Sequence, residues 1–199
     1  MKLTWAIGAN GESTHISEAR NGLKCACICP ICRGPLIAGH GKVVDHQFAH
    51  ACGEECLHAV ETALHLAAKD ILRVRKEFAL PAVEIPPDYG FPHIKIAPER
   101  RYPVESVALE KKLGSINPDV IIRIKGRELL VEVTVTHRTD KAKIRKIREL
   151  GMSCVEIDLS DTDRGPARDE LERIVVDGTG HKRWLHNERA EERRRWKLS

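Results

Sequence analysis

Residues 117–137, NPDVIIRIKGRELLVEVTVTH, decide the fold of this 199-residue chain. The stretch holds two runs rich in apolar and β-branched residues, joined by KGRE at positions 125–128. Runs of this kind form strands, and a glycine between them supplies the backbone freedom of a tight turn. The sequence therefore predicts a β-hairpin, with Gly126 and Arg127 expected at its tip.

This register sets which side chains share a face of the hairpin. It pairs Asp119 with Thr134 and Ile121 with Glu132. Directly paired residues lie on one face and side chains alternate along a strand, so Asp119, Glu132 and Thr134 are expected on the same side. The opposite face is apolar, and any symmetric turn of even length at this centre keeps that arrangement.

A half-buried hairpin with a wet polar face is the simpler interpretation. Glu132, however, lies within LLVEV at positions 129–133, a run too apolar for an edge that faces water. A carboxylate buried there needs a cation. Oxygen ligands suit Mg²⁺ or Mn²⁺, ions that polarise a phosphate and activate water. We therefore expect Asp119 and Glu132 to bind Mg²⁺ or Mn²⁺ at a catalytic site.

The order of these motifs resembles the PD-(D/E)XK nuclease superfamily. Pro118-Asp119 is followed one strand later by Glu132-Val133-Thr134, and then by a predicted helix and another strand. The match is more specific to the CoiA-like competence proteins and their phage relatives. It extends to a Cys-rich segment with HQFAH at 46–50, to ETALHLAAK at 61–69 and to EIDLS at 156–160. The superfamily lysine, two positions after the glutamate, is Thr134 here.

The resemblance implies an α+β (α/β) fold. Its restriction-endonuclease-like core would run helix, three strands, helix, strand, after a small Cys/His zinc-binding module. The expected domains are a zinc module at 1–53, a nuclease-like core at 54–178 and a basic C-terminal tail at 179–199. Six prolines within residues 81–103 predict an extended connection before the first core strand.

A structural zinc site is expected near the N-terminus. Cys29-x₂-Cys32-x₁₃-His46-x₃-His50 fits a tetrahedral site with two Cys and two His ligands, if the histidines lie one helical turn apart. Seven cysteines, mostly in this region, favour thiolate ligands over disulfides in a cytosolic protein. The other candidate ligands are Cys25, Cys27, Cys52 and Cys56, and Cys52-x₃-Cys56 could replace the histidines.

A helix is predicted over residues 54–76, where Glu61, His65 and Lys69 recur every fourth residue. Such a row is often a stabilising ladder on a wet face. The resemblance instead implies that Glu61 leans over the metal site. His65 and Lys69 would then lie near the scissile phosphate, as proton carrier or electrostatic stabiliser.

Two basic segments are candidates for gripping a nucleic-acid backbone. The first is a predicted helix over 141–150, in which Lys143 could also replace the missing motif lysine. The second is the tail, where residues 181–199 hold seven Lys/Arg and three Glu, equal to the whole net charge of +4. Either segment could instead be a solvated face. The expected contact residues are Lys69, Lys141, Lys143, Lys146, Arg193, Arg194 and Arg195.

Composition excludes a membrane protein of the usual helical kind. Hydrophobic residues make up 42% of the chain, but no apolar stretch approaches the roughly 18 residues of a membrane span. The N-terminus lacks the apolar core of a signal peptide, so a cytoplasmic protein is expected.

The leading hypothesis is a metal-dependent nuclease that hydrolyses phosphodiester bonds in DNA, in an uptake, recombination, phage or defence setting. The first alternative is an inactive nuclease-fold protein that binds nucleic acid, organised by a structural zinc. The second is a zinc-organised protein-interaction module. The sequence leaves a homo-oligomer or a protein partner open.

Overall fold

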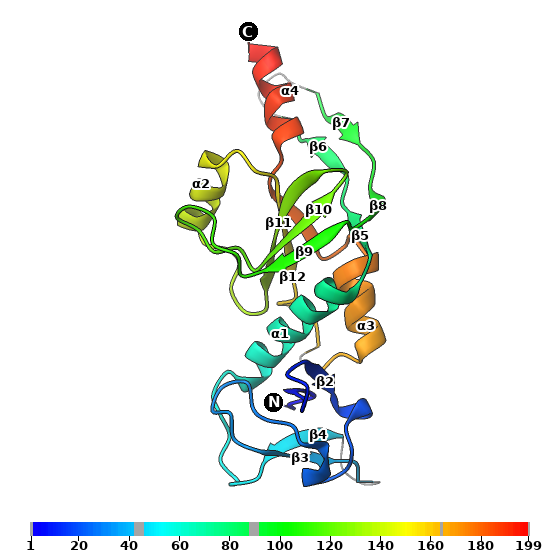
Figure 1. Ribbon diagram of the computed structural model, residues 1–199. Coiled ribbons are helices and arrows are strands. Elements are labelled where there is room, and N and C mark those ends of the chain that lie inside the picture. Colours follow the sequence, from blue (N-terminus) through cyan, green and yellow to red (C-terminus); the bar gives the residue numbers. More distant parts are fainter. Residues whose placement is uncertain (1, 42–45, 88–91, 164, 199) are drawn as a thin grey trace. The chain divides into compact units, whose positions relative to one another are not determined.

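The computed structural model describes residues 2–41, 46–87, 92–163 and 165–198 (Figure 1). The chain has a mixed α+β structure and falls into two compact units. The first unit comprises Met1–Ile71 and Ser160–Glu172, and the second Leu72–Leu159 and Arg173–Ser199. These units do not coincide with the predicted boundaries after residues 53 and 178, and those boundaries stay predictions.

The first unit combines short antiparallel strand pairs with helices. Trp5, Leu36 and Leu64 are among its fully buried side chains. Its strands pair as β1 with β2 and β3 with β4. The elements are β1 (Trp5–Ile7), β2 (Ser13–His15), the 3₁₀ turns η1 (Ile16–Glu18) and η2 (Leu23–Cys25), β3 (Leu36–Gly39), β4 (Gln47–His50), most of α1 (Ala59–Val74) and α3 (Arg168–Glu172).

Helix α1 is shorter than the predicted 54–76, mainly because it begins at Ala59 rather than at residue 54. His58 has a positive φ of 64°, which is incompatible with a helix, and Leu57 is 80% exposed. Leu57 therefore lies outside the helix and outside the core. Within the helix, the helical periodicity does bury one side, at Ala63, Leu64, Ala67, Ala68 and Ile71.

The second unit is built on a five-stranded sheet with the order β13-β12-β11-β10-β9. Neighbouring strands are antiparallel except β11 and β12, which are parallel and are connected through helix α2. Parallel neighbours require such a crossover. The strands are β9 (Ser106–Leu109), β10 (Val120–Ile124), β11 (Arg127–Thr134), β12 (Cys154–Asp158) and β13 (Lys182–His186), and α2 spans Lys141–Glu149.

Helix α2 begins and ends where the sequence predicts. The Asp140 side chain caps the N-terminus by accepting a hydrogen bond from the Lys143 N–H at 2.8 Å, and Gly151 follows the C-terminus with φ 67°. The apolar side of the helix packs on one face of the sheet (Figure 1). The cluster that it joins consists of Ile116, Ile121, Leu130, Ile147, Cys154 and Leu185.

The predicted hairpin forms, but its tip is one residue earlier than expected. Lys125 and Gly126 both have positive φ, 51° and 74°, as a two-residue hairpin turn of the primed type requires. Ile124 therefore pairs with Arg127, and Ile121 with Leu130 rather than with Glu132. Each partner moves by two residues, so the faces are those predicted. Asp119, Glu132 and Thr134 still project from the side that carries Ile121.

Two other segments have more structure than predicted. Residues 81–103 contain strands rather than only an extended connection, and residues 182–186 form β13 at the sheet edge rather than a free tail. Strand β5 pairs with β8, and β6 with β7. The bounds are β5 (Glu77–Leu80), β6 (Val83–Ile85), β7 (Ile94–Ala97), β8 (Arg100–Pro103), a π-helical turn (Arg173–Asp177) and α4 (Glu188–Leu198).

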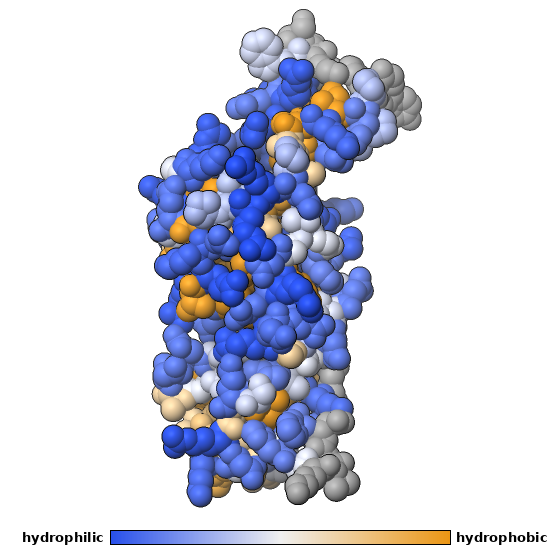
Figure 2. All heavy atoms as spheres, turned by 90° about the vertical axis from the view of Figure 1, so that its right-hand side faces the viewer, coloured by the Kyte–Doolittle hydropathy of each residue, from blue (hydrophilic) through white to orange (hydrophobic). Residues whose placement is uncertain are grey.

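The face drawn in Figure 2 is mostly hydrophilic, with apolar side chains in small separate groups. In the part of the chain that the structure describes, every helix is too short or too polar to cross a membrane.

Candidate functional sites

Four ligand-type side chains in the first unit meet at one point. The Sγ atoms of Cys29, Cys32 and Cys56 and a ring nitrogen of His50 all lie within 4.8 Å of one another. Three thiols and an imidazole at such distances form a donor set that suits tetrahedral zinc. The His50 Nε2 is buried without a hydrogen-bond partner among the described residues, and a metal would satisfy it. The cluster could therefore hold a metal such as zinc.

The backbone around the first two cysteines supports this geometry. The Ile31 N–H donates to Cys29 Sγ at 3.4 Å and the Gly34 N–H to Cys32 Sγ at 3.3 Å. Hydrogen bonds from the backbone stabilise thiolates, which are the form that binds metal. A Cβ at Gly34 would lie 3.2 Å from Cys32 Sγ, so the loop fits a glycine closely here.

The predicted ligand His46 is replaced by Cys56. Residues 47–50 form strand β4 rather than a helix, and four residues of strand span about 13 Å, too far for His46 and His50 to share one ion. His46 is exposed and its ring stacks on His40, with centroids 5.1 Å apart. Cys25, Cys27 and Cys52 also lie outside the cluster.

The acidic pair occupies the second unit, at the point where β10 begins beside β11. The Asp119 Oδ2 accepts a hydrogen bond from the Val133 N–H at 2.9 Å. Glu132 is only 2% exposed, and its Oε2 lies 2.6 Å from the ammonium of Lys143 on α2. Its other oxygen, Oε1, is buried and has no hydrogen-bond partner among the described residues. The site thus combines two carboxyl groups, one cation and one unsatisfied acceptor.

The electrostatics of this site are unusual for a carboxyl group. Burial raises the pKa of Glu132 to about 7, the hydrogen bond from Lys143 opposes this rise, and the nearby charge of Asp119 adds to it. The effect of Asp119 shows that the two carboxyl groups interact. A cation placed between the two carboxyl groups would offset both the desolvation of Glu132 and its repulsion from Asp119.

A second buried carboxylate, Glu156 on β12, lies beside Glu132 in register. Glu156 is fully buried, its Oε1 accepts from the Thr139 N–H at 2.7 Å, and its Oε2 accepts from the Arg183 guanidinium on β13. Glu156 is the first residue of the EIDLS motif at 156–160, and no role in a site was predicted for it. Its position in the apolar run CVEIDL, like that of Glu132 in LLVEV, was the available signal.

The remaining predicted catalytic residues are distributed as follows. Thr134 is buried in β11, and its hydroxyl donates to the Ile157 carbonyl at 3.5 Å. On α1, the Glu61 Oε2 lies 2.8 Å from the His58 Nδ1. Lys69, on the same helix, is buried at 4% exposure, whereas a contact with a nucleic-acid backbone would need an exposed side chain. Glu61, His65 and Lys69 belong to the first unit and the acidic pair to the second. Their grouping in one site stays a prediction.

The basic residues expected to contact nucleic acid are mostly exposed. Lys141 and Lys146 are exposed on α2, whereas Lys143 is partly buried against Glu132. Arg193, Arg194 and Arg195 are exposed on α4, with Arg194 paired to Glu191 at 2.7 Å.

The two tryptophans of this C-terminal region differ. Trp196 is 81% exposed, but Trp184 is fixed in β13, where its Nε1 donates to the Pro81 and Ala82 carbonyls. Trp184 is therefore held within the fold, whereas Trp196 lies on the surface.

Comparisons of the chain with models of protein families, with curated proteins and with solved structures found no match.

Proposed function

We propose that the chain is a metal-dependent nuclease that hydrolyses phosphodiester bonds, with DNA as its substrate in the cytoplasm. The observation that carries the proposal is the Glu132 carboxyl group. It is buried beside Asp119, with one oxygen on Lys143 and the other without a partner among the described residues. A carboxyl group in these surroundings is poorly explained by sheet stability alone, because an apolar residue would be cheaper to bury.

The residues fit a hard divalent ion. Carboxylate oxygens are the ligands that Mg²⁺ and Mn²⁺ prefer, and both ions commonly bind through one or two carboxylates plus the phosphate of the substrate. Asp119 and Glu132 would hold the ion, and the unpartnered Glu132 Oε1 would be one ligand atom. When bound, such an ion would polarise the phosphate and lower the pKa of water.

The other side chains have roles that follow from their contacts. Lys143 balances Glu132 in the absence of an ion, and its ammonium group could turn to a phosphate oxygen once an ion takes over Glu132. It would thus supply the charge that Thr134 lacks at the motif position. The exposed Lys141 and Lys146, on the same helix, would bind the flanking backbone.

The order of elements supports the resemblance to the PD-(D/E)XK superfamily and its CoiA-like members. Helix α1 precedes three neighbouring antiparallel strands, β9, β10 and β11, and α2 then leads to the parallel strand β12. The restriction-endonuclease-like core expected from the sequence has this order. Fold alone does not define an activity, so the proposal depends on the site.

The test is cleavage of single- and double-stranded DNA with Mn²⁺, comparing wild type with Asp119→Asn and Lys143→Met. We expect each variant to lose at least about a hundredfold in rate, since each removes one charged group from the reacting centre. Lys146→Met is the matched control, because it removes an exposed lysine from the same helix. Equal cleavage by wild type and Asp119→Asn would refute the assignment.

The second candidate is a nucleic-acid-binding protein without catalysis. It is favoured by the 2.6 Å contact of Lys143 with Glu132, which occupies a carboxylate oxygen, and by the uncharged Thr134 at the motif position. Retention of DNA at low salt, with no cleavage of any substrate in Mn²⁺ or Mg²⁺, would select this candidate.

A further inference from the structure

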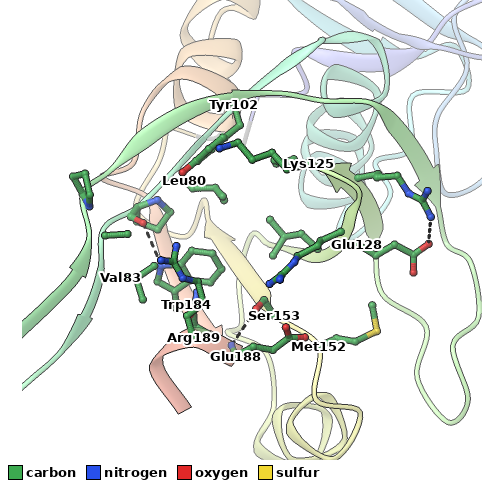
Figure 3. A pocket seen from close by; sticks show the side chains of 18 residues that line it. Leu80, Val83, Tyr102, Lys125, Glu128, Met152, Ser153, Trp184, Glu188 and Arg189 are labelled. Atoms are coloured by element: carbon green, nitrogen blue, oxygen red, sulfur yellow. Dashed lines mark hydrogen bonds and ion pairs between the residues drawn. The ribbon is translucent and has the colours of Figure 1, made fainter. Parts of the chain in front are cut away.

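A cavity of about 850 Å³ lies within the second unit, at the turn end of the β10–β11 hairpin (Figure 3). Its walls come from β5, β6 and β8, from the hairpin turn, from β13 and from the start of α4. It reaches both faces of β11 at the turn end of the strand, through Glu128 and Leu129, but its lining does not include Asp119, Glu132 or Lys143. The cavity is therefore separate from the acidic pair. Its volume is typical of a small-molecule site.

Basic side chains outnumber acidic ones around the cavity, with four Lys or Arg residues against Glu128 and Glu188. Lys125, Arg127 and Arg189 line it, and among the described residues none of the three forms an ion pair. A fourth, Arg123, lies 3.9 Å from Glu128. Several cations around one hollow repel each other, and an anion bound there would relieve the repulsion. The charge favours an anionic ligand, and guanidinium groups match a phosphate in geometry.

Two aromatic side chains from different strands also line the cavity. The Trp184 indole is held by its Nε1–H, which donates to the Pro81 carbonyl at 3.3 Å and to the Ala82 carbonyl at 3.1 Å. Tyr102 lies on the β8 side, with the Lys125 ammonium 5.1 Å from its ring centroid (Figure 3). Aromatic rings in a basic site offer a stacking surface for a nucleobase, because every base has a π-face.

Hydrogen-bonding groups lie near Trp184 at the start of α4. Ser153 and Glu188 point into the same part of the cavity as Arg189, and the Glu188 N–H donates to Ser153 Oγ at 3.1 Å (Figure 3). A carboxylate beside a hydroxyl provides acceptors for the hydroxyl groups of a sugar. The cavity thus combines cations, aromatic rings and sugar-type acceptors.

From these three features we infer that the cavity binds a nucleoside phosphate. The base packs against the Trp184 ring, and the phosphate is bound by Arg127 and Arg189, while Tyr102 and Lys125 form another part of the cavity wall. The same chemistry is offered by a free nucleotide and by the phosphorylated end of a nucleic-acid strand. The inference does not depend on hydrolysis at Asp119 and Glu132.

The test is isothermal titration calorimetry with AMP as the probe, without added divalent ions. We expect saturable binding with a stoichiometry of one, and at least about tenfold weaker binding of adenosine and of inorganic phosphate, since each lacks one half of the contacts. Arg127→Ala with Arg189→Ala is expected to weaken AMP binding by at least about tenfold. Both side chains are exposed, so the variant should fold.

Arg20→Ala with Lys24→Ala is the matched control, because it removes two exposed basic residues from the first unit. Absence of AMP binding, binding of phosphate as tight as that of AMP, or equal affinity in the two double variants would overturn the inference. Competition by 5′-phosphorylated (dA)₆ as strong as that by AMP would identify a strand end as the source, and weaker competition a free nucleotide. Asp119→Asn should bind AMP as the wild type does, which separates this result from the nuclease assay.

Discussion

Replacing Glu132 by glutamine tests the state of the buried carboxyl group directly. The residue is 2% exposed, and burial raises its pKa to about 7, from an ordinary value of 4.5. Between these two values the folded protein keeps a proton that the unfolded chain has released. Because the folded state binds more protons there, stability falls as the pH rises. Glutamine has nearly the same shape and does not titrate, so this contribution disappears in the variant.

The size of the effect follows from the two pKa values. Linkage between 4.5 and about 7 gives a loss of roughly 2 to 3 kcal/mol in the free energy of unfolding between about pH 5 and about pH 8. The stabilisation that Glu132 provides at low pH should be fully lost once the pH is well above the pKa of Glu132 in the folded protein. Other groups titrate in the same range, so the informative quantity is the difference between wild type and Glu132→Gln at each pH.

The assay is urea unfolding at several pH values, followed by circular dichroism, in buffer with zinc and without Mg²⁺ or Mn²⁺. Amide exchange on β11 provides a second measurement that is specific to the second unit. We expect the variant to be more stable relative to wild type at pH 8 than at pH 5. Mn²⁺ added at pH 8 should stabilise wild type more than the variant, since the ion would replace the missing proton. Parallel stability curves for the two proteins would refute the reasoning, because Glu132 would then titrate normally.

Three further predictions concern other parts of the molecule. Cys56→Ser should lose most of the bound zinc and destabilise the first unit, whereas His46→Ala should retain the metal, as measured by mass spectrometry of the native protein. Gly126→Ala should cost about 1 kcal/mol in urea unfolding, because φ is 74° and no atom lies within 4 Å of the added Cβ, so that only backbone strain acts. Burial lowers the pKa of Lys182 to about 7, so the unfolded state holds more protons above that value and stability should rise with pH from about 7; this rise should be absent in Lys182→Met.

The hairpin could be predicted because its pattern is local. Alternating β-branched residues around a glycine define two strands, and the face of each side chain follows from parity. The exact tip could not be read, because Lys125 adopts a positive φ that few residues other than glycine, asparagine or aspartate favour. Asp119 and Glu132 nevertheless share a face as predicted, because each cross-strand partner differs from the predicted one by two residues, an even number. An odd shift would have moved Glu132 to the other face.

The zinc ligands show the opposite case, in which spacing in the sequence is not enough. Cys29 and Cys32 lie in one tight loop, so their spacing predicts their geometry. The other two ligands depend on how β4 and the approach to α1 are arranged. His46 at four residues from His50 suits a helix but not a strand, and Cys56 becomes a ligand only through tertiary structure.

Strand β13 was missed because its charges suggested a solvated tail. Lys182 is buried, and its amine donates to the Ala79 and Val176 carbonyls at 2.9 and 3.0 Å. Arg183, the next residue, pairs with the buried Glu156. Both basic residues bind groups of the folded core, and two of the acceptors, the Ala79 carbonyl and Glu156, are distant in sequence. Net charge alone could not reveal this.

The pairing of Glu156 with Arg183 bears on how the acidic site is held. Glu132 and Glu156 are neighbours in register, and each has its own cation, Lys143 from α2 and Arg183 from β13. Glu156 also accepts from the Thr139 N–H, directly before the residue that caps α2. This bond fixes the start of the helix that carries Lys143, and the Arg183 guanidinium donates to the other oxygen of Glu156. The second carboxylate therefore positions the lysine over the first, which explains why the sheet buries two acids side by side where an apolar pair would stabilise it more.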